Sequence, residues 1–297
     1  MKKSVICLGV STLDQIFQVP ILPKPPAKLR ADAFVVTGGG MASNGAVAVQ
    51  RLGGQAQYWG RVGDDLTGEQ VLGLMAQEGV DIQNVRKLSG AKTKVAAILI
   101  DEDGERLIIS SPVQGYPSDV SWLPLSEVAK ADAVLADTRW LTGARALFEA
   151  AHQHNKPSVF DADGGVADAV LSIAQHATHP VFSETMLAEL DMGEPEEALP
   201  RAFGGYNEVV GVTLGGKGAL WWNGKELSSC PAPKVKAIDT LAAGDTFHGA
   251  LAQALAERQD IAAAMRFATY AAALKCTKFG GRAGIPTRQE LDAFLSA

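Results

Sequence analysis

The segment Asp239-Thr240-Leu241-Ala242-Ala243-Gly244-Asp245-Thr246-Phe247 carries the strongest signal in this chain. It opens a long apolar-periodic helix, predicted over residues 244–257, with a run of small residues. The N–H groups at a helix N-terminus attract anions, and small side chains let an anion approach them closely. We therefore expect an anion hole at this point, of a kind that suits a phosphate group.

Asp245 falls in the first turn of that helix. In this position an acidic side chain can cap free N–H groups, or it can take a proton from a hydroxyl group that attacks a phosphate. Both roles fit the position. The segment thus predicts an anion hole with a candidate base beside it.

Composition limits the classes of partner. The chain has 297 residues, of which 47% are hydrophobic and 20% charged, as is ordinary for an enzyme of one or two globular domains. Its formal net charge of -6 argues against nucleic acid or an anionic membrane as a partner. We therefore expect small-molecule ligands.

The cysteines and the apolar runs favour a cytoplasmic location. Cys7, Cys230 and Cys276 are widely spaced and odd in number, which supports neither a disulfide framework nor a metal site. The apolar run at residues 5–10 is too short for a signal peptide, and we find no run of the roughly twenty apolar residues that a membrane span needs. We expect a cytoplasmic protein.

Strand-like and helix-like runs alternate from residue 133 onward. This rhythm predicts an α/β fold, in which helices cover a parallel sheet and ligands bind beyond the carboxyl ends of its strands. Polar residues and glycines that directly follow predicted strands are therefore candidate site residues. They are Asp14, Asp137, Arg139, Asp161, Asp163, Ser183, Glu184, Gly215 and Gly216.

Two β-like segments interrupt the α/β pattern. One contains a proline-rich loop, and the other contains the hairpin signal Asp101-Glu102-Asp103-Gly104 between two apolar runs. They could pair as a small sheet over the strand ends and exclude water from a phosphate. We predict a β lid at residues 14–37 and 93–112, over a core of residues 1–13, 38–92 and 113–297.

A second glycine-bearing segment lies near the N-terminus. Gly38-Gly39-Gly40-Met41-Ala42-Ser43-Asn44 would bring backbone close to a ligand, and its amide suits a sugar hydroxyl. By itself the segment could equally be a plain loop with Asn44 as a helix N-cap. Combined with residues 239–247 it is far more specific.

Together these segments resemble the two signatures of the ribokinase family of carbohydrate kinases, also called the PfkB family, over essentially the whole chain. Gly38-Gly39 with Asn44 is similar to the first signature, and residues 239–245 are similar to the second. Ala242 stands where many members carry glycine. The resemblance implies a ribokinase-like three-layer α/β/α core, with a mostly parallel sheet and a small β-sheet lid.

The resemblance also implies roles at the reaction centre. Asp245 would activate the acceptor hydroxyl, while the N–H groups of Ala242, Ala243 and Gly244 would hold the transferring phosphate. The sugar would contact Asp14, Gly39, Gly40 and Asn44.

For the nucleotide, the resemblance points to ATP. The loop at residues 212–218 is similar to the family's nucleotide loop, with Thr213, Gly215, Gly216 and Gly218 near the phosphates. Residues 275–286, which include Gly280 and Gly281, resemble the closing loop that packs on adenine. A plain glycine turn between two helices would explain these glycines equally well.

Two metal ions are implied. Ser183-Glu184-Thr185-Met186 stands where the family has a magnesium element that begins with Asn and ends with Glu, so only Glu184 remains as a local carboxylate; Mg²⁺ is still expected with ATP. The Asp239-Thr240 pair and the closing loop would supply oxygens for a monovalent cation such as K⁺.

Within the family the sequence is most similar to sulfofructose kinases. In that group a Lys, an Arg and an Asn hold the sulfonate; Lys28 and Arg139 match the first two, and Ser110 occupies the position of the Asn. Such a pair of cations could clamp an anionic tail. Alternatively, Lys28 is a solvated lid charge and Arg139 pairs with Asp137 or Asp161.

We therefore predict an ATP-dependent kinase that phosphorylates a primary hydroxyl of a small sugar, with the 1-hydroxyl of 6-deoxy-6-sulfofructose as the first candidate. The alternatives are a neutral sugar such as ribose, fructose or 2-keto-3-deoxygluconate, a nucleoside, or a non-catalytic sugar- or nucleotide-binding protein. The resemblance also implies a homodimer formed through the lid, whose sheet edges need cover.

Overall fold

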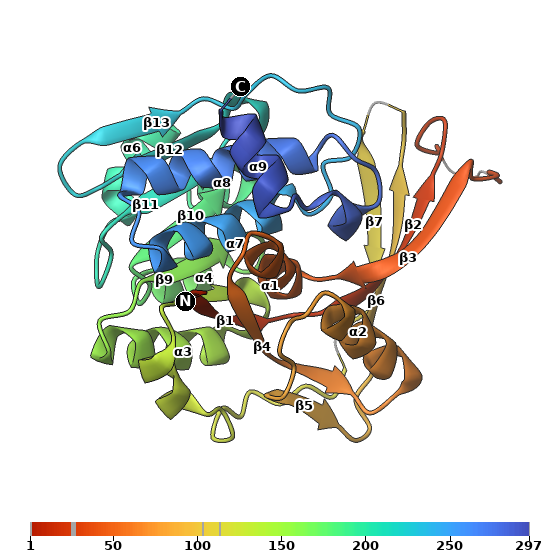
Figure 1. The fold of residues 1–297 in the computed structure, drawn as a ribbon, viewed down its shortest axis with the longest axis horizontal. Coiled ribbons are helices and arrows are strands. Elements are labelled where there is room, and N and C mark those ends of the chain that lie inside the picture. Colours follow the sequence, from red (N-terminus) through yellow and green to blue (C-terminus); the bar gives the residue numbers. More distant parts are fainter. Residues whose placement is uncertain (1, 25–27, 103, 113, 297) are drawn as a thin grey trace.

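A large, mostly parallel sheet forms the centre of the molecule. The computed structural model describes residues 2–24, 28–102, 104–112 and 114–296. In these residues nine strands pair in the order β13-β12-β11-β10-β9-β8-β1-β4-β5, and only the β11–β12 and β12–β13 pairs are antiparallel (Figure 1). The strands are β1 (Ser4–Gly9), β4 (Gln55–Gly63), β5 (Val85–Leu88), β8 (Ala133–Asp137), β9 (Ser158–Ala162), β10 (His179–Ser183), β11 (Val210–Thr213), β12 (Ala219–Trp222) and β13 (Leu227–Cys230).

Helices cover both faces of this sheet (Figure 1). On one face lie α1 (Met41–Arg51), α2 (Leu66–Gln77), α7 (Ala243–Ala256), α8 (Ile261–Lys275) and α9 (Arg288–Leu295). On the other face lie α3 (Leu141–Gln153), α4 (Ala167–Ala174), α5 (Glu184–Glu189) and α6 (Pro195–Ala202). The predicted three-layer α/β/α fold is confirmed. None of the described helices has the length and apolar character to span a membrane.

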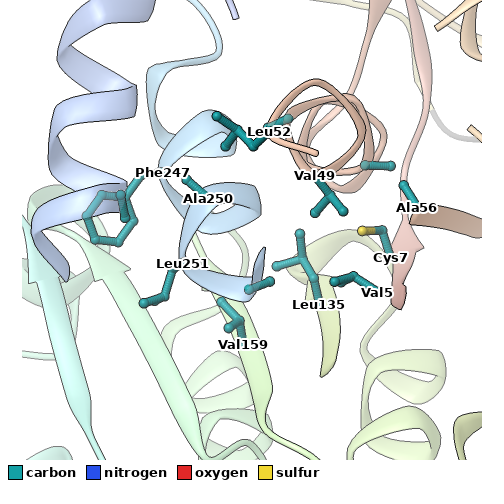
Figure 2. Close-up of a cluster of buried hydrophobic side chains, with 14 of the residues drawn as sticks. Val5, Cys7, Val49, Leu52, Ala56, Leu135, Val159, Phe247, Ala250 and Leu251 are labelled. Carbon is teal, nitrogen blue, oxygen red and sulfur yellow. The ribbon is translucent and has the colours of Figure 1, made fainter. Parts of the chain in front are cut away.

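Strand residues alternate between two hydrophobic cores. In β1, Val5 and Cys7 face the α1 and α7 side, whereas Ile6 and Leu8 face the α3 side. Figure 2 shows Leu135 of β8 among the apolar side chains between α1, α7 and the sheet. Full burial of such a side chain stabilises the fold by roughly 1.5–3 kcal/mol. The sheet is therefore a rigid base for the loops at its carboxyl edge.

A second sheet of four strands stands beside α1 and α2 (Figure 1). Its order is β3-β2-β6-β7, and the strands are β2 (Thr12–Gln18), β3 (Ala33–Gly39), β6 (Lys94–Ile100) and β7 (Arg106–Ser110). One face buries Ile16, Ala96, Ile98 and Ile100 against Leu241 and Phe279. These strands come from the segments in which we predicted the lid.

Two parts of the sequence prediction need correction. The alternation of strands and helices begins well before residue 133, since residues 55–88 already form β4, α2 and β5. Asp14 does not lie in a loop after a strand but within β2, where it pairs with Thr37 and Ala96. Of the Asp101–Gly104 hairpin signal, Asp103 lies outside the described residues, and β6 and β7 pair antiparallel on either side of it.

Candidate active site

The predicted anion hole lies at the N-terminus of α7. Ala242 is the N-cap of this helix and has a left-handed backbone with φ of 66°, a conformation that glycine adopts most easily. The N–H groups of Ala242 and Gly244 have no hydrogen-bond partner among the described residues, whereas the N–H of Ala243 donates to the Thr240 carbonyl at 3.2 Å. Two of the three predicted donors are thus free for a ligand.

Asp245 and Asn44 meet although 201 positions separate them. Asn44 Nδ2 donates to Asp245 Oδ2 at 2.7 Å. Asn44 lies inside α1, whose N-cap is Gly40, so the alternative that Asn44 is an N-cap is wrong. Arg282 Nε donates to Asn44 Oδ1 at 3.0 Å, and Arg282 Nη2 donates to Ser43 Oγ at 2.5 Å. Arg282 therefore fixes the orientation in which the Asn44 amide faces Asp245.

Burial raises the pKa of Asp245 to about 7. The hydrogen bond from Asn44 lowers this pKa, whereas the charges of Asp163, Asp14 and Asp137 raise it. Burial and the charges of Asp245, Asp163 and Asp137 also raise the pKa of Asp161, at the end of β9, well above its usual range. A carboxylate with a pKa near the working pH is suited to general base catalysis.

A cavity of about 250 Å³ lies in front of Asp245. Of the predicted sugar ligands it includes Asp14, Gly40, Asn44, Ser110 and Arg139, together with the anion-hole residues. A size of this order suits a small sugar better than a larger molecule.

Gly38 and Gly39 make room for side chains of the site rather than for a ligand. A Cβ at Gly39 would collide with the Asp14 carboxylate, and a Cβ at Gly38 would collide with the Arg282 guanidinium. Gly39 does not line the acceptor cavity, so its contact with the sugar stays a prediction. Asp14 is only 6% exposed and accepts from Thr12 Oγ1 at 2.6 Å, and burial raises its pKa.

The cations of the acceptor cavity differ from the predicted pair. Arg139 and Lys94 line both this cavity and an adjoining cavity of about 80 Å³, which Arg61 also lines. Lys28 is exposed in the β2–β3 connection and is not among the lining residues. Arg139 has neither Asp137 nor Asp161 as an ion-pair partner among the described residues; its backbone N–H donates to Asp137 Oδ1 at 2.8 Å.

A second cavity, of about 800 Å³, lies on the other side of the anion hole. Its lining includes Thr213, Gly215 and Gly216 as predicted. Apolar residues of α8 and of the segment before the 239–247 turn provide a surface that suits a planar base. They are Ala232, Pro233, Val235, Ala237, Ala272, Ala273 and Cys276, and Thr269 lies beside them. The two cavities share Arg106, Asp163, Thr240, Ala243 and Gly244.

Three predicted nucleotide glycines have other surroundings. Gly218 has φ of 101°, and a Cβ there would collide with the carbonyl of Cys230. The N–H groups of Gly280 and Gly281 donate to Asp239 Oδ2 at 2.9 and 2.8 Å. None of these glycines lines the larger cavity. They shape the loops around the site instead.

The magnesium element also differs from the prediction. Glu184 is exposed, lies 3.6 Å from Lys217 Nζ and lines neither cavity. Ser183 Oγ donates to Asp163 Oδ1 at 2.7 Å, and Asp163 stands where the two cavities meet. No group of three or more His, Cys, Asp or Glu side chains suited to a metal ion occurs in the described part of the chain. The position of Asp163 suits an ion that phosphate oxygens and water also coordinate.

The Asp239-Thr240 pair does not fit a monovalent cation. Lys275 Nζ donates to the backbone carbonyl of Asp239 at 2.7 Å, and Arg106 Nη1 donates to Thr240 Oγ1 at 2.5 Å. Protein cations thus occupy the predicted ligand oxygens.

Comparisons with known proteins agree with this geometry. The model of the pfkB family carbohydrate kinases matches residues 2–288. The chain belongs to the PfkB family. It is 29% identical to the ribokinase of Haemophilus influenzae over 305 residues, which cover 99% of each protein. It is 28% identical to the ribokinase of Bacillus subtilis over 299 residues, which cover 99% of this chain and 100% of that protein.

Solved structures of the PfkB family share the fold. The ribokinase of Thermotoga maritima is 27% identical and superposes with a TM-score of 0.84, covering 100% of both chains. A presumed ribokinase of Agrobacterium tumefaciens is 36% identical with a TM-score of 0.95, covering 100% of this chain and 98% of that one. This PfkB-family chain is a ribokinase-family sugar kinase, a phosphotransferase with an alcohol group as acceptor.

Several residues of the site were missed by sequence reasoning: Arg61, Lys94, Arg106, Lys275 and Arg282. Each is a basic residue in or beside a strand, a helix end or a glycine turn, where solvated charges are common. Only Arg282 carried a usable signal, since it follows the glycine pair of the closing loop.

Proposed function

We propose that this protein transfers the γ-phosphate of ATP to a primary hydroxyl group of a small sugar, with Asp245 as the general base. One observation carries the proposal: Asp245 lines the acceptor cavity directly beside Ala243 and Gly244, the anion-hole residues that line both cavities. The larger cavity has the volume and the apolar lining for a nucleotide.

Different residues of the site have different roles in the transfer. Asp245 takes the proton of the attacking hydroxyl, while the free N–H groups of Ala242 and Gly244 stabilise charge on the transferring phosphate. Asp14 and Asn44 orient the sugar. The small sheet serves as a lid that excludes water. Mg²⁺ neutralises phosphate charge when it is bound with ATP, and Asp163 with Ser183 would hold it.

For the acceptor, we propose a sugar with an anionic tail, and 6-deoxy-6-sulfofructose remains the first candidate. Lys94, Arg139 and Arg61 converge beside the acceptor cavity, and none of them lies within 4 Å of a carboxylate in an ion pair of the described residues. The charges of Asp137, Asp14 and Asp161 act on these cations from a greater distance. Three cations without a direct carboxylate contact favour a ligand of opposite sign. Lys94 takes the role predicted for Lys28.

A neutral sugar is the second candidate, because curated relatives include ribokinases and deoxyribokinases. ATP consumption with sulfofructose, fructose, fructose 6-phosphate, ribose, 2-keto-3-deoxygluconate and adenosine tests both. If the tail is anionic, Lys94→Ala and Arg139→Ala raise the acceptor KM by about tenfold or more, whereas Lys28→Ala leaves it unchanged. If the acceptor is neutral and its KM is the same in all three variants as in the wild type, the proposal of an anionic tail is contradicted. If none of these compounds causes ATP consumption but some of them raise the melting temperature, the protein is a binding protein without catalytic activity.

We also infer a homodimer and a cytoplasmic location. The outer face of the small sheet exposes Phe34, Val36, Leu107 and Ile109, and the same face of a second copy would cover them. An ATP-consuming enzyme with free cysteines suits the reducing cytoplasm.

A further inference from the structure

Protein cations stand where the family resemblance predicts a monovalent ion. Lys275 Nζ lies 2.7 Å from the backbone oxygen of Asp239 and 3.4 Å from its Oδ1. Arg106 Nη1 lies 2.5 Å from Thr240 Oγ1. An added ion at these oxygens would face two positive charges at close range.

The Asp239 carboxylate is already fully used. Its Oδ1 accepts from the N–H of Leu241 at 2.7 Å, and its Oδ2 accepts from the N–H groups of Gly280 and Gly281 at 2.9 and 2.8 Å. The side chains of both Asp239 and Lys275 are 0% exposed. Buried charges need partners of opposite sign, and here each residue is the partner of the other.

The closing loop packs directly on the lysine. A Cβ at Gly284 would lie 2.6 Å from the Lys275 carbonyl oxygen and 3.3 Å from Lys275 Cε, so this position needs a residue without a side chain. The N–H groups of Ile238 and Asp239 donate to the next carbonyl, that of Cys276, at 2.8 and 3.2 Å. The end of α8 is thereby joined to the segment that leads into the anion hole.

We propose that the ammonium group of Lys275 takes the place of a monovalent cation and that Lys275 is a positioning residue for the anion hole. Asp239 holds the anion-hole segment through Leu241 and the closing loop through Gly280 and Gly281. A covalently attached ammonium neutralises Asp239 without any dissolved ion. The kinase should therefore work equally well without K⁺. The activity measurements rest on the proposed function, whereas the stability measurements rest on this geometry alone.

The first test uses the wild-type enzyme. Its phosphorylation rate is measured in KCl, NaCl, NH₄Cl and choline chloride at equal ionic strength. We expect rates within about threefold of one another, because no ion site needs to be filled. A larger stimulation by K⁺ over choline overturns the proposal.

The second test needs no activity. The melting temperature of the wild-type protein is compared in KCl and choline chloride, and we expect values that agree within about 1 °C, since an ion that binds only the folded state would raise it. A specific rise with K⁺ overturns the proposal. If the sugar panel finds no acceptor, the kinase proposal fails, and this comparison still decides the role of Lys275.

The third test changes the lysine. Lys275→Ala leaves the buried Asp239 without its counter-charge, and we expect a Tm lower by about 5–15 °C and a kcat lower by about tenfold or more. NH₄Cl or KCl, but not choline, should recover part of both. The matched control is Lys278→Met, which removes a surface lysine 2.7 Å from Glu290 and should change neither.

An unchanged Tm and kcat in Lys275→Ala would overturn the proposal, as would losses that no small cation relieves. Lys275→Met, which keeps the volume of the stem, serves as the second variant if the alanine protein does not fold. If neither variant folds, the two wild-type measurements decide.

Discussion

At the scale of single residues, the reaction centre depends on carboxylates that burial has made harder to ionise. Asp245, Asp161, Asp137 and Asp14 all have raised pKa values, and burial is the largest cause in each case. Only Asp245 combines a raised pKa with a hydrogen bond from Asn44 and a place beside the anion hole. This combination distinguishes the proposed base from its neighbours.

We expect Asp245→Asn to lower kcat by about 10²–10⁴-fold, because the amide cannot accept the hydroxyl proton. The acceptor KM should change little. Steady-state kinetics and sugar-induced thermal shifts check this result. An unchanged kcat would contradict the role of Asp245 as a base.

The same variant tests the direction of the pKa shift. The folded-state pKa of Asp245 is about 7, above its usual value, so its contribution to stability is present below about pH 4 and is lost as the pH rises through 7. Asp245→Asn should therefore raise the Tm relative to wild type at about pH 8 and change it little at about pH 4. Thermal unfolding at both pH values measures this, and a lower Tm at the higher pH would show that the carboxylate stabilises the fold.

The pH dependence of the wild-type rate follows from the same pKa. Since the base must be ionised, kcat/KM should fall by about tenfold per pH unit below about pH 7. A profile that stays flat down to about pH 5 would mean that the group with the raised pKa is not the base.

Arg282 should influence this profile through Asn44. Arg282→Ala removes both a nearby positive charge and the donor that fixes the Asn44 amide, so the acidic limb should move up by about one pH unit. Arg51→Ala is the control, since Arg51 Nη1 donates to the carbonyl of Arg282 at 3.0 Å and does not touch Asn44. An equal shift in both variants would point to loop packing alone.

At the scale of elements, the two glycines at the end of β3 decide whether the site can form. The chain passes so close to the Asp14 carboxylate and the Arg282 guanidinium that neither Gly38 nor Gly39 has space for a Cβ. β3, α1 and the closing loop can therefore pack together in only one arrangement. Gly38 and Gly39 thus permit the close approach of the Arg282 and Asp14 side chains behind the acceptor cavity.

Gly39→Ala should displace the Asp14 carboxylate, and we expect the acceptor KM to rise by about tenfold or more with a lower Tm. Gly73→Ala is the matched control, because Gly73 lies in α2 with open space around a Cβ. There alanine should stabilise the protein by about 0.5–1 kcal/mol. Kinetics and thermal unfolding of both variants check this, and an unaltered KM in Gly39→Ala would mean that Asp14 does not bind the sugar.

At the scale of the whole molecule, the large sheet is covered on both faces, whereas the small sheet is covered on one. Its inner face packs on Leu241 and Phe279, and its outer face leaves Ile109 62% exposed. An apolar sheet face of this kind is usually covered in solution. The proposed dimer would cover it and stiffen the lid.

Ile109→Glu should convert a dimer into monomers, since two buried carboxylates would face each other. Leu66→Glu is the control, because Leu66 is 84% exposed at the start of α2. Sedimentation velocity measures both variants, and a wild-type protein that is already monomeric would refute the dimer.

Local sequence signals were enough for the parts of the site that lie within one segment. The small residues before Asp245 and the apolar-periodic run after it lie within one segment, so the helix N-terminus and the place of Asp245 in its first turn could be predicted. The alternation of strands and helices predicted the three-layer fold in the same way. By contrast, Lys94 and Arg282 look like ordinary surface charges until β6 and the closing loop are placed beside Asp245.

The sequence by itself determined the family, the sheet type and the place of Asp245 in the first turn of α7, because these depend on short motifs and on periodic burial. Only the tertiary structure decided which cations surround the acceptor, which carboxylate stands between the cavities, and that Lys275 neutralises Asp239. Contacts of this kind join residues far apart in the chain, as Arg282 and Ser43 do across 239 positions. Such pairs depend on the packing of whole elements, and no local pattern in a single sequence specifies them.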